Sequence, residues 1–501
     1  MENKFYITTA ILYTNGPVHI GFAFELILAD VLARYHRQQG DNTWFLTGTD
    51  EHGTSVSRAA EKLNKKPIEL ADEVANQAQE LVKILNISNN DFIRTSDQKR
   101  HWPSVIKVWN KLLENGDLYK KEYEGLYCVG HESFIKKSDL VDGVCPLHKT
   151  KPETVKEENW FFKLTNYKNE IKNKIESGEL EIKPESKKNE LLNLLGDAED
   201  VSFSRPASKL KWGIPVPNDP ESTLYVWADA LTNYISALDY ASDEKKFNEY
   251  WPADVHLVGK DILRFHAMIW PAMLLSVGLK LPKSIYVHGF INVDGQKMSK
   301  TVGNVIDPFK IIEKYGADVV RYFLLREIPS DQDGDFSEEK LIARYNGDLA
   351  NGLGNLVSRV ATLIENNMDS ELIYSSSVID EELKKAVVRI KEKYGRAIDN
   401  FLLHEALASV WELISIANVY INDHKPWALA KEDKAEFLTV MTNAVFLIYT
   451  LSNFLLDPFV PETARKIREV FGAEEKISQI DGYKFIIKKT TPLFPRLIAK
   501  S

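Results

Sequence analysis

The sequence predicts an α/β protein in which a parallel sheet is split by an insertion and followed by an all-α helical bundle. Over the first hundred or so residues, short apolar runs alternate with helical periodicity, a pattern typical of parallel sheets. This rhythm breaks between about 120 and 205 and then resumes. From about 337 to 471 only helical periodicity remains, which indicates a bundle of helices.

The first half of the sheet is predicted from three short apolar runs, at 5–7, 44–46 and 91–94. A turn at 14–17, Thr-Asn-Gly-Pro, precedes a helix predicted from 20 to about 37, in which apolar residues recur at helical spacing and Gly40 provides the stop. The segment 47–53 is expected to be a loop. Two helical stretches follow that loop before the third strand.

After the insertion, strands are predicted at 224–227, 255–258 and 284–287. Asp307 and Pro308 predict the N-cap and first residue of a helix that ends near Gly316. The apolar window 438–456 is interrupted by threonine, serine and asparagine, so we expect a buried helix there and not a membrane span. We find no internal repeat and no low-complexity linker.

Length and composition are those of a globular protein with two to four domains. The 501 residues are 44% hydrophobic and 27% charged, which excludes global disorder. The net charge of −9 argues against unspecific nucleic-acid binding but leaves open an RNA partner met by local basic patches. The N-terminus lacks a signal-peptide pattern, so we expect a cytoplasmic protein without membrane or DNA partners.

Two short motifs indicate a phosphate-binding site. His19-Ile20-Gly21 lies between the first strand and the first helix, where parallel sheets bind ligands and a helix N-terminus favours an anion. The segment Asp-Gly-Gln-Lys-Met-Ser-Lys-Thr at 294–301 carries two lysines three apart, which suits a triphosphate whose charge grows during displacement at the α-phosphorus. Taken alone, each motif has a simpler interpretation: a helix cap or surface residue for His19, and a solvated basic loop for 294–301.

The two cysteines of the chain fall in a pattern typical of a structural metal site. Cys128-x2-His131 and Cys145-x2-His148 offer four nitrogen and sulfur ligands in two turns, the spacing of a closed tetrahedral zinc site. A reducing compartment argues against a disulfide between the cysteines. We therefore expect one structural Zn²⁺ per chain, with a metal-free knuckle as the alternative.

Together, the His-Ile-Gly and Lys-Met-Ser-Lys motifs resemble the signatures of class I aminoacyl-tRNA synthetases. The resemblance to methionyl-tRNA synthetases of bacterial type runs nearly end to end, in FLTGTDEHGT, EGLYCVGHESF, SRPASKLKWGIPVP, LYVWADALTNYISALDY, HLVGKDILRFHAMIWPAML and KPWALAK. It implies that methionine and ATP give methionyl-adenylate and pyrophosphate. The methionyl group would then move to the 2′-hydroxyl of the terminal adenosine of tRNA(Met), initiator tRNA included, for translation elongation and initiation.

The resemblance also implies a domain organisation. A Rossmann-type catalytic domain is split by an inserted connective domain with a zinc knuckle, and an anticodon-binding bundle follows. The expected boundaries are 1–118 and 223–290 for the two catalytic halves, 119–222 for the insertion, 291–350 for the Lys-Met-Ser-Lys loop and stem-contact region, and 351–501 for the bundle. The chain ends directly after the bundle, and we expect a monomer.

The same resemblance assigns the amino-acid site. The residues expected to bind methionine are Ile11, Tyr13, Asp50, Arg205, Trp227, Ala230, Tyr234, His266 and Trp270. Asp50 matches the carboxylate that binds the substrate ammonium, and aromatic rings suit a polarizable thioether. Arg205 matches an arginine near the substrate carboxylate, with a structural ion pair as an equal alternative. Without the resemblance, the aromatic residues would be read as plain core.

For the nucleotide, the resemblance implies His19, Gly21, Phe22, Gly259, Asp261, Lys297 and Lys300. His19, Lys297 and Lys300 are the expected catalytic residues facing the triphosphate, the Asp261 carboxylate takes ribose hydroxyls, and Mg²⁺ accompanies the ATP. Phe22 departs from the family pattern, which usually has a histidine at this position. We expect Phe22 to pack under the adenosine, at the loss of one hydrogen-bond donor.

The residues expected to read the CAU anticodon are Asn355, Arg359 and Trp427. Asn355 and Arg359 are four residues apart on one predicted helix, so both can face one base. Trp427 follows Pro426 and could stack on an unpaired base. In isolation, a packing tryptophan and a surface Asn/Arg pair would be the simpler interpretation.

Other classes fit less well. A synthetase for isoleucine, valine or leucine needs an editing domain, and the insertion is too short for one beside the knuckle. A cysteinyl enzyme needs a further zinc-binding cysteine, and an ordinary nucleotidyltransferase does not need the bundle. A degenerate paralogue that binds tRNA without catalysis remains the alternative because of Phe22, although Asp50 and the intact Lys-Met-Ser-Lys motif argue against it.

Overall fold

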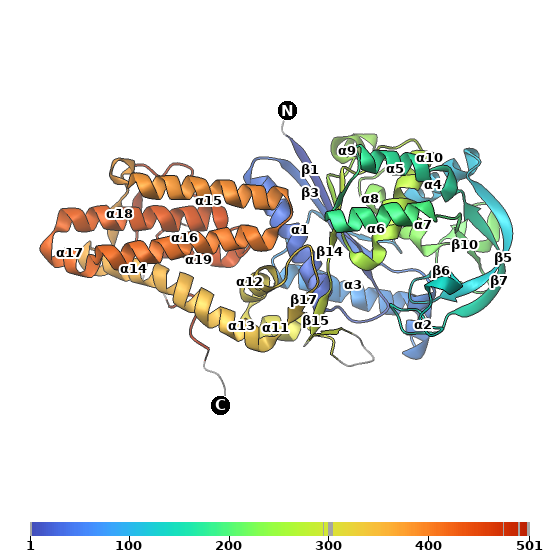
Figure 1. Cartoon of the computed structure of the whole chain (residues 1–501), viewed down its shortest axis with the longest axis horizontal. Helices are drawn as coiled ribbons and strands as arrows, with labels where there is room; N and C mark the ends of the chain where they lie inside the picture. Colours follow the sequence, from blue (N-terminus) through green and yellow to red (C-terminus); the bar gives the residue numbers. More distant parts are fainter. Residues whose placement is uncertain (1–2, 294, 299–303, 474, 489–490, 498–501) are drawn as a thin grey trace. The chain divides into compact units, whose positions relative to one another are not determined.

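The computed structural model describes residues 3–293, 295–298, 304–473, 475–488 and 491–497 (Figure 1). The chain separates into two compact units. The first comprises residues 1–29, 39–83 and 87–288, and the second comprises 30–38, 84–86 and 289–501. Of the two lysines predicted to face the triphosphate, Lys300 lies outside the described residues, and Lys297 is described by its backbone alone.

A seven-stranded sheet forms the centre of the first unit, and each pairing described in it is parallel. The strand order is β2-β3-β1-β13-β14-β8, with β4 also paired to β3. The strands are β1 (Lys4–Thr9), β2 (Leu12–Tyr13), β3 (Asn42–Asp50), β4 (Asp91–Arg94), β8 (Glu181–Lys183), β13 (Val255–Gly259) and β14 (Ser284–His288). The predicted parallel sheet, split by an insertion, is confirmed.

The central strands β13 and β14 are buried along their whole length, as expected for strands covered on both faces. Their neighbour β1 pairs with β3 on its other side. The carboxyl ends of these parallel strands therefore meet at one edge of the sheet, where ligands bind in such folds. Asp50, Gly259 and His288 are the last residues of β3, β13 and β14.

Helices surround this sheet. The predicted first helix is confirmed as α1 (Ile20–Gln38), and Gly40 after it adopts a positive φ of 89°, which suits glycine at a helix end. The other helices of the unit are α2 (Thr54–Lys62), α3 (Pro67–Ile84), α4 (Trp102–Glu114), α5 (Lys168–Glu176), α6 (Glu185–Gly196), α7 (Val226–Ala230), α8 (Asn233–Ser236), α9 (Glu244–Tyr250), a π-helical turn (Phe265–Ile269) and α10 (Trp270–Ser276).

Two predictions of local structure were wrong. The expected loop begins later, because β3 continues to Asp50 through pairing with β4 and β2. The run 224–227 is not a strand: β12 (Asp219–Leu224) ends at Leu224, and Trp227 belongs to α7. The Tyr225 carbonyl accepts hydrogen bonds from the backbone N–H groups of Ala228 and Asp229. Four consecutive apolar residues carry no period by which to tell a strand from a helix start.

The inserted segment forms an antiparallel sheet of its own, in the order β6-β5-β7-β9 (Figure 1). Its strands are β5 (Leu118–Cys128), β6 (Ser133–Ile135), β7 (Glu153–Phe162) and β9 (Val201–Ser202). A second small sheet contains β10 (Ser204–Pro206), β11 (Pro215–Val216) and β12. The segment also returns one strand, β8, to the edge of the main parallel sheet beside β14.

The second unit is mainly a helical bundle, in which α15 packs along α16 and α16 along α18 (Figure 1). Its helices are α11 (Pro308–Tyr315), α12 (Ala317–Glu327), α13 (Glu338–Arg344), a π-helical stretch (Tyr345–Gly354), α14 (Asn355–Asn367), α15 (Glu381–Asp399), α16 (Leu403–His424), α17 (Pro426–Glu432), α18 (Lys434–Thr450), a π-helical turn (Leu451–Leu455) and α19 (Pro461–Val470). Asp307 caps α11 as predicted, accepting a hydrogen bond from the Phe309 N–H.

The prediction of helices alone across 337–471 was wrong in one detail. The strand β18 (Glu371–Ile373) pairs with β19 (Lys484–Ile486), which lies outside that range. A small sheet of β16 (Gln296–Lys297), β15 (Ile291–Val293) and β17 (Gly334–Phe336) completes the unit. In the described part of the chain, one helical stretch, Lys434–Leu455, is long and apolar enough to cross a membrane, but it is largely buried in the bundle, as the interrupted pattern predicted.

Candidate functional site

Asp50 is a buried carboxylate at the carboxyl end of β3. Its side chain is 3% exposed, and its Oδ1 atom has no hydrogen-bond donor among the described residues. Burial, together with the nearby carboxylates Asp229, Glu132 and Glu51, raises the pKa of Asp50 well above its usual range. A buried anion without a cation is costly, so this position is suited to a positively charged ligand group.

Asp229 on α7 is a second buried carboxylate near Asp50, and both of its oxygens have partners. Its Oδ2 atom is 2.6 Å from His52 Nδ1, and its Oδ1 atom is 2.7 Å from His101 Nε2. Burial opposes ionisation of Asp229, but the two histidines outweigh it and lower its pKa. Asp229 therefore remains an anion held by the protein itself, which leaves Asp50 as the carboxylate available to a ligand.

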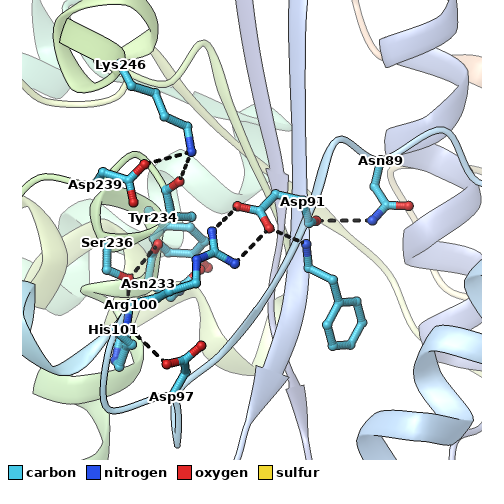
Figure 2. Close-up of polar contacts among 12 residues, drawn as sticks. Asn89, Asp91, Asp97, Arg100, His101, Asn233, Tyr234, Ser236, Asp239 and Lys246 are labelled. Carbon is cyan, nitrogen blue, oxygen red and sulfur yellow. Dashed lines mark hydrogen bonds and ion pairs between the residues drawn. The ribbon is translucent and has the colours of Figure 1, made fainter. Parts of the chain in front are cut away.

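Asp91 provides a useful contrast on the neighbouring strand β4 (Figure 2). Its two carboxylate oxygens accept hydrogen bonds from the Arg100 guanidinium at 3.1 and 2.6 Å. Its side chain is 13% exposed. Asp91 is thus a nearly buried aspartate whose charge is already neutralised within the fold, unlike Asp50.

An aromatic cluster contains four of the residues predicted to bind the amino acid. Tyr234 is at its centre: its hydroxyl lies 2.7 Å from His266 Nε2, and its ring lies 6.0 Å from that of Trp270. The Trp227 ring lies 6.1 Å from His266 and stacks on Phe265 at 3.8 Å. Predicted residues from two separate segments are therefore brought together. Ala230 is buried on α7, the helix that also carries Trp227, and Ile11, which follows β1, is partly buried.

The cluster is uncharged. His266 Nδ1 donates to the Ile262 carbonyl at 3.0 Å, so its Nε2 accepts from the Tyr234 hydroxyl. Burial lowers the pKa of His266 to about 4. Trp270 is fully buried and donates from Nε1 to His256 Nε2 at 3.2 Å. A neutral surface of aromatic rings with one phenol suits an apolar, polarizable side chain.

A second group of residues marks the carboxyl ends of β13 and β14. A Cβ added at Gly259 would lie 2.8 Å from Asp261 Oδ1, so glycine leaves room for this carboxylate. Glu25 on α1 accepts a hydrogen bond from the Ala10 N–H at 2.5 Å and lies 3.2 Å from His288 Nε2. Burial raises the pKa of Glu25. Glu25 was not predicted from the sequence, although an acidic residue in the apolar stretch IGFAFELILADVL was a signal.

The residues of the His-Ile-Gly motif open α1. The His19 carbonyl accepts hydrogen bonds from the N–H groups of Phe22 and Ala23 at 3.0 and 3.3 Å. His19 and Gly21 are partly buried, and the Phe22 side chain is 4% exposed. Phe22 is therefore a buried apolar residue in the first turn of α1. This helix start follows the carboxyl ends of β1 and β2, where parallel sheets bind ligands.

Arg205 is engaged in an ion pair. Its guanidinium donates from Nε and Nη2 to Glu157 at 2.7 and 2.8 Å and lies 4.0 Å from the centre of the Tyr127 ring. Both partners are nearly buried. This is the structural ion pair that the sequence left open. Arg205 also lines a cavity of roughly 650 Å³ against the antiparallel sheet of the inserted segment. Phe265, which stacks on Trp227, lines the same cavity.

The predicted metal ligands converge. One ligand atom from each of Cys128, His131, Cys145 and His148 lies within 4.8 Å of all the others. Cys145 Sγ is 3.6 Å from Nδ1 of both histidines, and Cys128 Sγ is 3.7 Å from His148 Nδ1. Tetrahedral zinc with ordinary bond lengths puts sulfur and nitrogen ligands about 3.6 Å apart. The donor set and its spacing therefore fit zinc.

In the second unit, two of the predicted anticodon residues are in contact. The Arg359 guanidinium on α14 lies 5.7 Å from the centre of the Trp427 ring on α17, and the ring is 47% exposed. Arg359 also donates to Asn422 Oδ1 on α16 at 2.9 Å. Asn355 is exposed one turn earlier on α14. Asn422 was missed by sequence analysis.

Comparisons with known proteins agree across the chain. The model for class I tRNA synthetases (M) matches residues 5–147 and 135–361, and that for the anticodon-binding domain of methionyl-tRNA ligase matches 375–487. Methionine–tRNA ligases of Thermotoga maritima and Caldanaerobacter subterraneus are 43% and 44% identical over 99% of this chain, which spans 81% and 79% of their lengths.

Solved structures agree with these sequence matches. Mycobacterium tuberculosis methionyl-tRNA synthetase in complex with methionyl-adenylate superposes with a TM-score of 0.93 at 36% identity, over 99% of this chain and 100% of that one. The apo form of the same enzyme gives a TM-score of 0.86 at 33% identity, over 100% of this chain and 99% of that one.

Proposed function

The chain belongs to the methionyl-tRNA synthetase family of class I aminoacyl-tRNA synthetases, and from that premise we propose which residues perform each step. The protein is an ATP-dependent methionine–tRNA ligase. The alternative of a degenerate paralogue is not favoured, because relatives named as ligases match almost the whole chain. Charging takes place where translation does, so we place the enzyme in the cytoplasm. The domain boundaries given above and a monomeric state are part of the same proposal.

Asp50 binds the ammonium group of methionine. The observation that carries this assignment is the buried Oδ1 atom of Asp50, which has no donor among the described residues. The thioether then lies against the neutral cluster of Trp227, Tyr234 and His266, with support from Ile11, Tyr13, Ala230 and Trp270. Because His266 is held neutral by burial, the aromatic part of the pocket offers no charge to compete with an apolar side chain.

Activation is a displacement at phosphorus. A carboxylate oxygen of methionine attacks the α-phosphorus of ATP, and the bond to the bridging oxygen of the β-phosphate breaks, so that pyrophosphate leaves with the electron pair. His19, Lys297 and Lys300 stabilise the growing phosphate charge, an assignment supported by the motif match. The Asp261 carboxylate, beside Gly259, accepts hydrogen bonds from the ribose hydroxyls. Mg²⁺ would accompany ATP as part of the substrate and would offset phosphate charge.

Transfer completes the reaction. The 2′-hydroxyl of the terminal adenosine attacks the methionyl carbonyl carbon, the mixed-anhydride C–O bond breaks, AMP leaves with the electron pair, and the hydroxyl proton is released. The anticodon of tRNA(Met), initiator tRNA included, is read by Asn355, Arg359 and Trp427. The contact between Arg359 and the exposed Trp427 ring supports this placement, because guanidinium groups and aromatic rings both stack on unpaired bases.

The function is tested by exchange of labelled pyrophosphate into ATP with each of the twenty amino acids. We expect exchange with methionine alone. Exchange with another amino acid would contradict the assigned substrate. No exchange from folded, zinc-replete protein would contradict the catalytic assignment and leave tRNA binding as the retained function.

The metal site has its own test. We expect metal analysis of protein purified without chelator to give about one zinc per chain, and Cys145→Ser to lose the metal, because structural zinc needs all four ligands. The variant should also unfold at a lower temperature, since metal-binding free energy stabilises the fold. Asp142→Asn, at an exposed position in the same loop, is the control. Zinc well below one per chain in the wild type would remove the assignment.

Phe22 is proposed to pack under the adenosine in place of the usual histidine. Phe22→Ala should then raise the KM for ATP in pyrophosphate exchange, because removing a buried aromatic ring leaves a cavity at the nucleotide site. Phe22→Leu keeps most of the apolar volume, so its KM for ATP should lie between those of the wild type and Phe22→Ala. Unchanged ATP affinity and turnover in Phe22→Ala would show that the ring has no role at the nucleotide.

A further inference from the structure

A buried carboxylate joins the segment 128–148, which carries the four predicted zinc ligands and is called the metal-cluster loop below, to the edge strand β2 of the main sheet. Glu132 directly follows His131, adopts a left-handed backbone conformation with φ of 50° and is 3% exposed. Its Oε1 atom accepts hydrogen bonds from the Tyr13 hydroxyl at 3.0 Å and from the Ser55 N–H. Its Oε2 atom accepts from the Tyr127 hydroxyl at 2.6 Å. Both oxygens are therefore used.

Glycine at position 53 makes this junction possible. Gly53 has a φ of 105°, and a Cβ built there would lie 2.5 Å from the Tyr13 hydroxyl and 3.1 Å from Glu132 Oε1. Any larger residue would push the phenol and the carboxylate apart. The chain thus keeps space clear for the Tyr13–Glu132 hydrogen bond, which joins residues 119 positions apart.

His131, which precedes Glu132, contacts a second residue predicted to bind methionine. Trp227 donates from Nε1 to the His131 carbonyl at 3.3 Å, while its ring stacks on Phe265 with an interplanar angle of 4°. Tyr13 and Trp227 come from β2 and α7, elements far apart in sequence. Two successive residues of the metal-cluster loop therefore each fix one aromatic side chain: His131 fixes Trp227, and Glu132 fixes Tyr13.

We propose that Glu132 is a positioning residue for methionine: it holds Tyr13 in the orientation that the amino-acid pocket requires. The proposal rests on the proposed assignment of Tyr13 and Trp227 to that pocket. Glu132 acts through the phenol and the Ser55 N–H, and it need not touch the substrate. It gives the inserted domain a direct part in amino-acid affinity, beyond holding a metal.

The first test separates binding from chemistry. In methionine-dependent pyrophosphate exchange, Glu132→Ala should raise the KM for methionine by at least roughly tenfold with little change in the KM for ATP or in kcat, since it removes the only acceptor described for the Tyr13 hydroxyl. Glu132→Gln keeps a carbonyl oxygen for Tyr13 and Ser55 and should restore most of the affinity. Glu153→Ala, an exposed carboxylate on β7 paired with Arg58, is the matched control.

The second test is a double-mutant cycle with Tyr13→Phe. If Glu132 acts through Tyr13, the phenylalanine change should raise the KM for methionine in the wild type and have little effect in Glu132→Ala. Additive effects would overturn the proposal, and so would an unchanged KM in Glu132→Ala, an equal loss in Glu132→Gln, or loss of zinc from Glu132→Ala. A wild type without methionine-dependent exchange would instead defeat the proposed function and this inference with it.

Discussion

Asp50→Asn is expected to abolish methionine activation while making the protein more stable. The substitution keeps the shape of the side chain but removes the anion proposed to bind the substrate ammonium. Removing one partner of a buried ion pair costs about 3–5 kcal/mol, which corresponds to a fall of roughly 150- to 5,000-fold in kcat/KM for methionine. Pyrophosphate exchange at varied methionine concentration measures this loss.

The gain in stability follows from the raised pKa of Asp50. A carboxyl whose folded pKa lies above its unfolded value costs nothing at low pH, where both states are protonated. As pH rises through the unfolded pKa toward the folded one, the unfolded chain releases its proton first and the fold loses stability. Asparagine avoids this loss, so the Asp50→Asn variant should unfold at a higher temperature than the wild type at neutral pH.

The same pKa predicts the pH dependence of activity. The ammonium of methionine needs the ionised carboxylate, so kcat/KM for methionine in the wild type should fall as pH decreases through the raised pKa of Asp50. Thermal unfolding and exchange kinetics, both followed across pH, test the two effects together. A variant that kept methionine affinity, or that lost stability at neutral pH, would contradict the assignment.

Asp91→Asn is the matched control for this experiment. Asp91 is also a largely buried aspartate on the sheet, but the Arg100 guanidinium already neutralises its charge (Figure 2). Replacing it leaves Arg100 without its partner, so we expect lower stability and an unchanged KM for methionine. The two substitutions should therefore move stability in opposite directions.

Trp427→Ala is expected to abolish tRNA charging and spare adenylate formation. Stacking on an unpaired base is worth about 1–3 kcal/mol, and an exposed cation–π contact such as that with Arg359 adds about 0.5–1 kcal/mol. Their combined loss lowers kcat/KM for tRNA by up to roughly a thousandfold. Aminoacylation of tRNA(Met) transcript measures the loss, and pyrophosphate exchange in the same preparation should equal that of the wild type.

Two variants sharpen this test. Trp427→Phe keeps an aromatic face and should recover part of the charging activity. Val388→Ala removes an apolar side chain that is 56% exposed on α15 of the same bundle and should charge normally. If Trp427→Ala charged tRNA at the wild-type rate, the exposed ring would have no part in anticodon recognition.

Features that are local in sequence were predicted well. The helix start at Asp307 and Pro308, the strand at 91–94 and the four metal-cluster residues are each defined by neighbours within a few positions, and the structure brings the four cluster residues together as expected. The boundary at Leu224 was misplaced because its flanking residues are apolar whether they belong to a strand or to a helix. The pairing of β18 with β19 was missed because it joins segments more than a hundred residues apart.

Two of the residues not predicted from the sequence, one in each unit, have partners that are distant in sequence. Glu132 meets Tyr13 across 119 positions, and Asn422 meets Arg359 across 63. Neither has a motif around it, since a glutamate in a loop and an asparagine on a helix are ordinary surface residues by composition. Only the folded chain shows that Glu132 is buried and that Asn422 orients a guanidinium.

The order of strands in the main sheet has a consequence for synthesis of the protein. β1 pairs with β13, and Tyr6 and Asp254 are bonded across 248 positions. At ribosomal speeds of about 5–20 residues per second, one edge of β1 stays open for roughly 12–50 s after that strand emerges. Contacts of such long range also fold slowly. Nascent chains should therefore expose an unpaired, apolar strand edge long enough to depend on chaperones, and truncation before residue 255 should yield aggregates.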